Sequence, residues 1–151
     1  MTNKLIGLLL VLPLVGAQPA GYKYWSAAEL KAMSKPLANK SNAITSSENL
    51  GNFGPDHALM IHRDGSGVAE LHETEADVMV VVTGTGTLVV GGTMPGSKTT
   101  APGEVRAPNV EGGARQNIGP GDILHIPPKT PHQVLLEPGT QITYFTLKVK
   151  E

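Results

Sequence analysis

The feature that most constrains this chain is the spacing of its apolar runs, which are short from Ala58 onward and are separated by glycine or proline. The sequence holds 18 glycines and 12 prolines, and runs such as "HALMIHR", "DVMVVVTG" and "QITYFTLKV" lie between them. Short apolar runs bounded by turn residues are typical of strands. We therefore expect an all-β fold of about eight or nine strands, a small antiparallel β-barrel or double-stranded jelly roll that leaves few edges unpaired.

The N-terminal residues have the composition of an export signal. Lys4 precedes an apolar run from Leu5 to Val15, and the small residues Val15 and Ala17 stand before Gln18. The run is too short to span a bilayer, so we expect a signal peptide at residues 1–17 and an exported protein, periplasmic or secreted. An uncleaved membrane anchor is the alternative.

Two further regions follow this signal. Residues 18–56 are expected to form an N-terminal extension, in which Ser26 and Glu29 make a capping box, Pro36 ends a short helix, and residues 37–56 form a loop. Residues 57–151 are expected to form one β-domain. The sequence also predicts a hairpin at "DGSG", pairing of strands 77–84 and 87–92, and a long loop at residues 93–113 with one strand near 104–107.

Composition limits the partners and the ligands. The formal net charge is −1, which provides no basic surface for nucleic acid, so we expect a small-molecule ligand instead. The chain has no cysteine, so any metal must be held by nitrogen and oxygen atoms. The unbroken apolar run from Val78 to Val82 indicates a strand covered on both faces, and we expect a second subunit of a homodimer as the outer cover.

Four polar residues are candidate metal ligands. Residues two apart on a strand share a face, so Glu70 and His72 in "AELHE" can reach one ion. Asp77 opens the next strand, and His132 follows a corner of three prolines in "GDILHIPPKTPH". Proline cannot donate to a sheet ladder, so this corner is rigid and holds His132 in place.

The segment from Gly121 to Leu136 resembles the second motif of the cupin superfamily, G-x5-P-x-G-x2-H-x3-N. In "GDILHIPPKTPHQVLL", Gly121, Pro127 and His132 stand at the family's positions. Lys129 replaces the usual glycine, and Leu136 replaces the asparagine.

The segment from Glu70 to Gly84 is similar to the first cupin motif, G-x5-H-x-H-x(3,4)-E-x6-G. In "ELHETEADVMVVVTG", Glu70 takes the place of the first histidine, His72 is the second, Asp77 replaces the glutamate and Gly84 closes the motif. The resemblance covers about residues 58–149. It implies a cupin barrel with a metal site of Glu70, His72, Asp77 and His132, in a family that includes dioxygenases, isomerases, lyases, decarboxylases and non-enzymatic binding proteins.

Other interpretations of the same residues remain open. A shifted register makes His72 the first ligand and Thr74 the second, although a neutral hydroxyl is a poor ligand. One of the carboxylates Glu70 and Asp77 can instead carry a proton, which makes both candidate catalytic residues. The barrel can also be metal-free, with its histidines satisfied by hydrogen bonds.

The remaining candidates carry weaker signals. Alternation counted back from Pro127 makes His125 a candidate substrate contact, whereas His62 is expected at a surface edge. Arg106 and Arg115 can anchor an anionic substrate, but solvated ion pairs are the favoured interpretation.

Two functions follow from these observations. Two histidines with one or two carboxylates suit a divalent transition metal, Fe, Mn, Zn or Ni. The first hypothesis is an exported metal-dependent enzyme that acts on a small oxygenated molecule by oxygenase-, lyase- or isomerase-type chemistry. The alternative is a non-catalytic module that binds a metal or a small ligand.

Overall fold

The computed structural model describes residues 16–39 and 44–151, and within them the chain forms one helix and eleven strands. Their bounds are α1 Ala27–Ala38, β1 Thr45–Phe53, β2 Asp56–Arg63, β3 Ala69–His72, β4 Glu75–Gly84, β5 Gly86–Val90, β6 Lys98–Ala101, β7 Glu104–Ala107, β8 Ala114–Ile118, β9 Ile123–Ile126, β10 His132–Leu135 and β11 Ile142–Lys150. Nearly all of the predicted signal peptide lies outside the described residues, so export remains a prediction.

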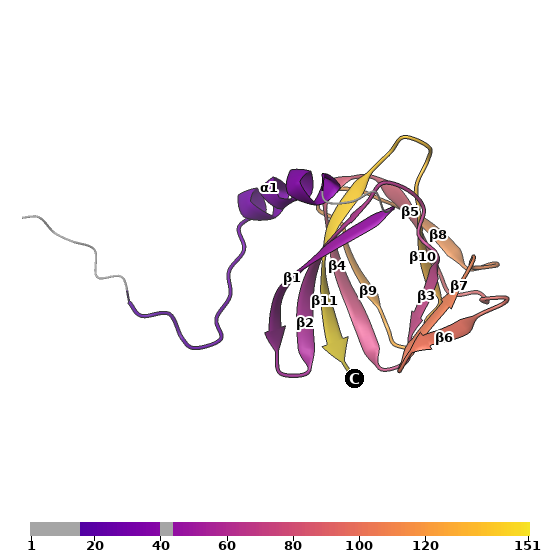
Figure 1. The fold of residues 1–151 in the computed structure, drawn as a ribbon, viewed down its shortest axis with the longest axis horizontal. Coiled ribbons are helices and arrows are strands. Elements are labelled where there is room, and N and C mark those ends of the chain that lie inside the picture. The colour runs from indigo at the N-terminus through magenta and orange to yellow at the C-terminus, as the bar shows by residue number, and fades with distance from the viewer. Residues whose placement is uncertain (1–15, 40–43) are drawn as a thin grey trace, which may run out of the picture.

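The strands form two sheets that face each other, as Figure 1 shows. The five-stranded sheet has the order β1-β2-β11-β4-β9, and the six-stranded sheet has the order β6-β7-β3-β10-β5-β8. All paired strands are antiparallel. The predicted all-β, double-sheet fold is confirmed, and the sheets do not close into a continuous barrel.

The apolar core lies between the sheets, where the inward-facing residues of both sheets meet. Met79 and Val81 of β4 point inward and pack with Leu88 of β5 and Ile142 of β11. These four side chains are at most 3% exposed. The core therefore fixes the relative position of the two sheets.

The predicted loop at residues 37–56 is wrong in its second half, where β1 pairs with β2 as a nine-residue edge strand. The strand lacks the apolar alternation that identifies strands in a sequence, because most of its residues are exposed or half-buried. Its turn into β2 passes through Gly54, whose φ of +66° suits glycine.

Helix α1 begins where the sequence predicts and ends later. Ser26 and Glu29 form the expected capping box. The helix continues past Pro36 to Ala38, and the backbone N–H of Asn39 still donates to the carbonyl of Lys35. In the described part of the chain, no helix has the length and apolar character that spanning a bilayer requires.

Two predicted strand pairings are also wrong, because the chain changes sheet at both places. The segment "DGSG" connects β2 of the first sheet to β3 of the second rather than forming a hairpin. Strands β4 and β5 likewise lie in different sheets. At this crossing Gly84 has a φ of +76°, and a Cβ there would collide with the carbonyl oxygen of Gln141.

The outer covering of β4 differs from the expectation as well. Val78, Val80 and Val82 are half-buried, and α1 packs against β2 and β4 on the outside of the first sheet. A helix of the same chain thus provides part of the cover that we assigned to a second subunit. The predicted loop at residues 93–113 holds the expected strand β7 and one more, β6, whose residues are all exposed.

Candidate metal centre

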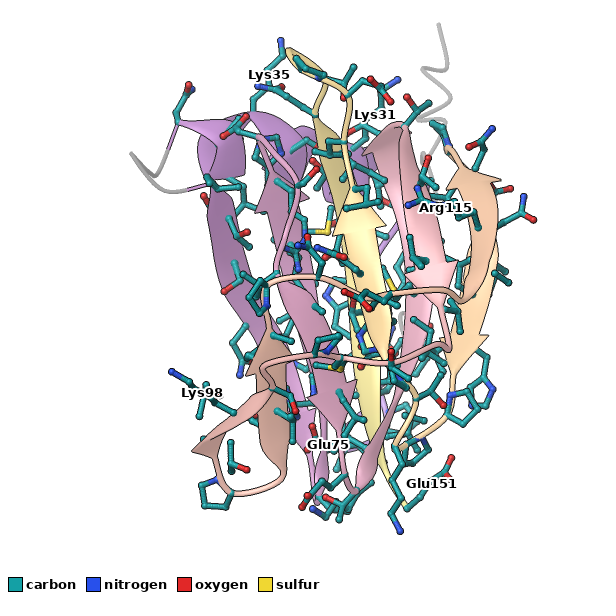
Figure 2. All side chains as sticks on the ribbon, turned by 90° about the vertical axis from the view of Figure 1, so that its right-hand side faces the viewer. Lys31, Lys35, Glu75, Lys98, Arg115 and Glu151 are labelled. Atoms are coloured by element: carbon teal, nitrogen blue, oxygen red, sulfur yellow. The ribbon has the colours of Figure 1, made fainter. Side chains whose placement is uncertain are left out.

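A cavity of about 370 Å³ opens between the two sheets. Its lining follows the period of two expected for strands: His57, Leu59, Ile61 and Arg63 come from β2, and Glu75, Asp77 and Met79 come from β4. Strands β3, β7, β10 and β11 contribute the remaining charged residues. Figure 2 places Glu75 at the end of the molecule opposite to Lys31 and Lys35 of α1.

Each sheet contributes one cross-strand pair of polar residues to the cavity. Asp77 of β4 lies opposite Lys148 of β11, and Glu70 of β3 lies opposite His132 of β10. Directly opposed side chains on antiparallel strands are close neighbours. The registers of the two sheets therefore bring residues far apart in the sequence to one point.

The four predicted ligands meet there. The Nε2 atom of His72 lies 3.4 Å from Asp77 Oδ2 and 3.8 Å from Glu70 Oε2. The Nε2 atom of His132 is also 3.4 Å from Asp77 Oδ2, and the two imidazole rings are 5.3 Å apart between centroids. Both histidines and Asp77 are at most 5% exposed.

The outer nitrogen of each histidine is held by an acceptor. Both carboxylate oxygens of Glu104 contact His72 Nδ1, at 2.8 and 3.0 Å, and the carbonyl of Thr130 lies 3.0 Å from His132 Nδ1. An imidazole whose Nδ1 donates its hydrogen presents the lone pair of Nε2 on the other side. Both lone pairs therefore point toward Asp77, in the arrangement that metal-binding histidines adopt.

The proline corner fixes His132 relative to His72, as the sequence predicts. The backbone N–H of Lys129 donates to the carbonyl of His72 at 2.7 Å, which ties the corner to β3. Lys129 has a φ of +61°. This left-handed conformation explains why the cupin motif has glycine at that position.

A lysine that sequence reasoning missed reaches the same centre. The ammonium of Lys148 lies 2.5 Å from Asp77 Oδ1 and 2.6 Å from His72 Nε2, and the residue is 8% exposed. At 2.6 Å one of the two nitrogens must accept, so the neutral His72 receives a hydrogen bond from the ammonium. The centre of the four predicted ligands therefore holds one positive charge supplied by the chain.

Arg63, which was also missed, holds Glu70. Its guanidinium donates to Glu70 Oε1 at 3.0 Å, to the Tyr144 hydroxyl at 2.8 Å and to Thr45 Oγ1 at 3.0 Å. This leaves Glu70 Oε2 on the side of His72. Glu104, the third residue that was missed, pairs with Arg106 at 2.6 Å.

These contacts keep the carboxylates ionised. Burial opposes the charged form of Asp77, but the close contacts with His132 and His72 and the charge of Lys148 lower its pKa far below the ordinary value. Burial is likewise outweighed at Glu70, where the charge of Arg63 lowers the pKa. Burial and the charge of Lys148 oppose the charged form of His72, but the contacts with Asp77 and Glu104 outweigh them and raise its pKa.

The other sequence candidates lie elsewhere. Thr74 is exposed and accepts a hydrogen bond from Lys150 at 2.6 Å, so it faces away from the histidines. His125 is exposed because Ile126, not His125, occupies the inward position on β9. His62 is buried rather than at the surface, between Thr143 and Asp64.

The two arginine candidates lie in different places, and only one of them lines the cavity. Arg106 lines the cavity, and its partner Glu104 makes it part of an ion pair. Arg115 is exposed on β8.

One signal in the sequence could have identified Lys148. In "TYFTLKV" the alternate residues Tyr144, Thr146 and Lys148 share a face, and all three are buried. A lysine in phase with the buried positions of a strand is unusual, because a buried ammonium needs a partner. No comparable local signal identifies Arg63 or Glu104, whose roles depend on strand pairing.

No family model matches this chain, and no curated relative matches it. Solved structures with the same fold do. A cupin-2 domain protein from Rhodospirillum rubrum is 15% identical with a TM-score of 0.52, over 72% of this chain and 61% of its own. The polyketide cyclase RemF from Streptomyces resistomycificus is 20% identical with a TM-score of 0.50, over 72% of this chain and 66% of its own.

A third neighbour is the Cnp3 cupin domain from Schizosaccharomyces pombe, at 5% identity and a TM-score of 0.55, over 73% of this chain and 67% of its own. This chain thus spans about three fifths to two thirds of the length of these neighbours. At such identities the likeness concerns the fold, and the resemblance to cupins is confirmed at that level. The chain has the cupin fold.

The donor atoms of the centre fit a divalent transition metal. Glu70, His72 and His132 each offer a ligand atom within 4.8 Å of the others, and Asp77 Oδ2 lies between the two imidazoles. Nitrogen and carboxylate donors of this kind suit borderline divalent ions. The position of the Lys148 ammonium indicates that this centre stabilises positive charge.

Proposed function

We propose that this protein is a metal-binding cupin that acts on a small oxygenated molecule in the cavity between its sheets. The single observation that carries the proposal is the pair of imidazoles whose Nε2 atoms converge on Asp77, each with its Nδ1 held from behind. Metal-binding histidines are held in the same way, with the outer nitrogen on a fixed acceptor and the inner nitrogen facing the ion.

In this proposal His72, His132, Glu70 and Asp77 hold the ion. A bound divalent ion supplies Lewis acidity or oxygen activation to a substrate oxygen. Efficient proton carriers have a pKa near the working pH, whereas Glu70 and Asp77 both have lowered pKa values. This favours ligand roles for both carboxylates over the catalytic proton transfer that the sequence also suggests.

Arg63 and Glu104 have supporting roles. Arg63 keeps Glu70 ionised and directs its Oε2 toward His72. Glu104 fixes the tautomer of His72 through Nδ1. The cavity volume of about 370 Å³ suits a small molecule, and RemF is an example of an enzyme with this fold.

The experiment is elemental analysis of the purified protein beside His72→Ala and His132→Ala variants. We expect one equivalent of Fe, Mn, Zn or Ni in the parent protein and loss of that metal in both variants. An Ala variant of the exposed His125 is the matched control and retains the metal. Equal trace metal in all four proteins, or none after reconstitution, rejects the proposal.

A non-catalytic binding module is the second candidate. The observation that favours it is the contact of Lys148 with both Asp77 and His72, which satisfies two of the four ligands without an ion. Turnover of a substrate that a chelator abolishes would select the enzyme. A protein that retains a small ligand through purification and shows no chelator-sensitive turnover would select the module.

The proposal includes export and a homodimer, with no nucleic-acid partner, all of which rest on the sequence. Mass spectrometry of the protein purified from the periplasm or medium tests export, with Gln18 expected as the first residue. Light scattering on the same sample tests the dimer. Binding of nucleic acid at physiological salt would contradict the charge argument.

A further inference from the structure

The charges that line the cavity are matched one to one, with a single exception. Arg63 pairs with Glu70, Arg106 pairs with Glu104, and Lys148 pairs with Asp77. The fourth acid, Glu75, lines the same cavity. Within residues 16–39 and 44–151, the Glu75 carboxylate makes no ion pair.

Glu75 lies two residues before Asp77 on β4 and lines the same cavity as Lys148. Glu75 and Asp77 lie two positions apart on β4, so both side chains project from one face about 6.5 Å apart. The carboxylate of Glu75 and a nitrogen of His72 lie within 4.8 Å of each other. The Lys148 ammonium contacts Nε2 of the same ring, so Asp77 and Glu75 both lie near the imidazole that this ammonium contacts.

The charge balance distinguishes the two partners. With Lys148 on Asp77, the cavity carries one excess negative charge, at Glu75, and the metal centre already contains a cation. With Lys148 on Glu75, every cation of the cavity is paired and Asp77 is released beside the two imidazoles. That arrangement presents two histidines and one carboxylate, a set of ligands that suits divalent transition metals.

We propose that Lys148 is a built-in competitor for the metal centre, and that a divalent ion binds by moving its ammonium from Asp77 to Glu75. This inference rests on the proposed function, because it concerns the same site. Buried like charges at one centre exclude each other, so the ion and the ammonium do not share Asp77. Lys148 thereby sets how tightly the protein holds its metal.

The test is calorimetric titration of the full protein with Zn²⁺ after removal of metal by a chelator. Lys148→Leu removes the ammonium and adds no ligand atom, so we expect Zn²⁺ binding to tighten by on the order of 10- to 100-fold, the range of a typical coupling between sites. Lys31→Leu is the matched control, because Lys31 is exposed on α1 at the end of the molecule opposite Glu75. It leaves the affinity unchanged.

A second variant tests the role of Glu75. Glu75→Gln removes the alternative partner of the ammonium, so it weakens Zn²⁺ binding when Lys148 is present and has no effect in the Lys148→Leu background. Weakening in both backgrounds would instead indicate an ion in the neighbouring cluster of His72, Glu75 and Glu104, and would overturn the inference.

The failures of the two proposals are distinguishable. If the parent protein binds Zn²⁺, His132→Ala abolishes binding and Lys148→Leu binds no tighter, the competitor role is wrong and the metal centre stands. If neither the parent nor Lys148→Leu binds Zn²⁺, the metal centre itself is wrong. If Lys148→Leu does not fold, the ¹⁵N-labelled side-chain signal of Lys148 in the parent protein decides: it shifts on Zn²⁺ addition if the ammonium moves, and an unchanged signal in the zinc-bound protein overturns the inference.

Discussion

The two ends of the space between the sheets have opposite character, although the same strands build both. Along β4 the inward residues change from Asp77 to Met79 and Val81, and along β11 they change from Lys148 to Tyr144 and Ile142. One end is a packed apolar core, and the other is a cavity lined by charges.

This difference separates the apolar residues that stabilise the fold from the charged residues that the fold positions. Apolar burial at the core end contributes about 25 cal/mol per Å² of surface removed from water. At the polar end, the desolvation of Asp77 and Lys148 offsets much of their attraction. The polar end therefore adds little net stability, which favours a functional reason for its ion pairs.

The largest expected effect comes from removing one charge of the Asp77–Lys148 ion pair and leaving the other buried. Asp77→Asn leaves the Lys148 ammonium buried without its counter-charge, so we expect the free energy of unfolding to fall by about 3–5 kcal/mol. Urea denaturation measures this change. Glu73→Gln, on the exposed turn after β3, is the matched control and changes stability by less than about 0.5 kcal/mol.

Removing both charges sharpens the same comparison. The double variant Asp77→Leu with Lys148→Leu should recover most of the loss and match or exceed the parent stability, because a buried ion pair replaced by apolar residues is often neutral or stabilising. A double variant that is as unstable as Asp77→Asn would show that the polar end is structural.

The next largest effect is a loss of stability that we expect from a substitution at the apolar end. Ile142 is fully buried, so Ile142→Ala should destabilise the protein by about 2–5 kcal/mol through lost burial and the cavity it leaves. Zinc affinity of the folded variant should equal that of the parent, since the metal centre lies at the other end. A parallel loss of zinc affinity would mean that the two ends are not independent.

A smaller effect is expected from the residue behind His72. Glu104→Gln keeps the shape of the side chain but weakens its hold on His72 Nδ1, and loss of such a partner costs about 10- to 100-fold in metal affinity. Titration with Zn²⁺ measures it. Glu111→Gln, outside the cavity lining, controls for the lost charge, and an unchanged affinity in Glu104→Gln would contradict the tautomer assignment.

The smallest expected effect concerns the proline corner. Lys129 has a positive φ, so Lys129→Gly should relieve strain and stabilise the protein by about 0.5–1 kcal/mol, the gain being reduced by the freedom of glycine in the unfolded chain. Thermal unfolding measures this shift. Zinc affinity should not fall, because the backbone N–H that bonds to His72 is kept.

The sequence predicts the double-sheet fold and the convergence of Glu70, His72, Asp77 and His132, because a period of two fixes which side chains share a face. It does not predict which strands pair. The sequence-based pairing of residues 77–84 with 87–92 is wrong because the chain changes sheet at Gly84.

Sequence reasoning missed Arg63, Glu104 and Lys148 for the same reason, because it does not predict which strands pair. Arg63 and Glu104 join the site only through contacts between segments that are distant in the chain. Lys148 carries a local signal, an ammonium in a buried phase, but its partner Asp77 is set by the register of β4 with β11. The error at His125 is a shift of one residue, which reverses the face of a side chain on a strand.

The most direct measurement is anomalous diffraction from crystals of the protein grown with Zn²⁺. Our account predicts one peak within about 2.0–2.3 Å of His72 Nε2 and His132 Nε2, with the Lys148 ammonium moved away from Asp77. A protein in which Lys148 still contacts Asp77 and His72 at saturating zinc, with no peak between the imidazoles, would contradict it.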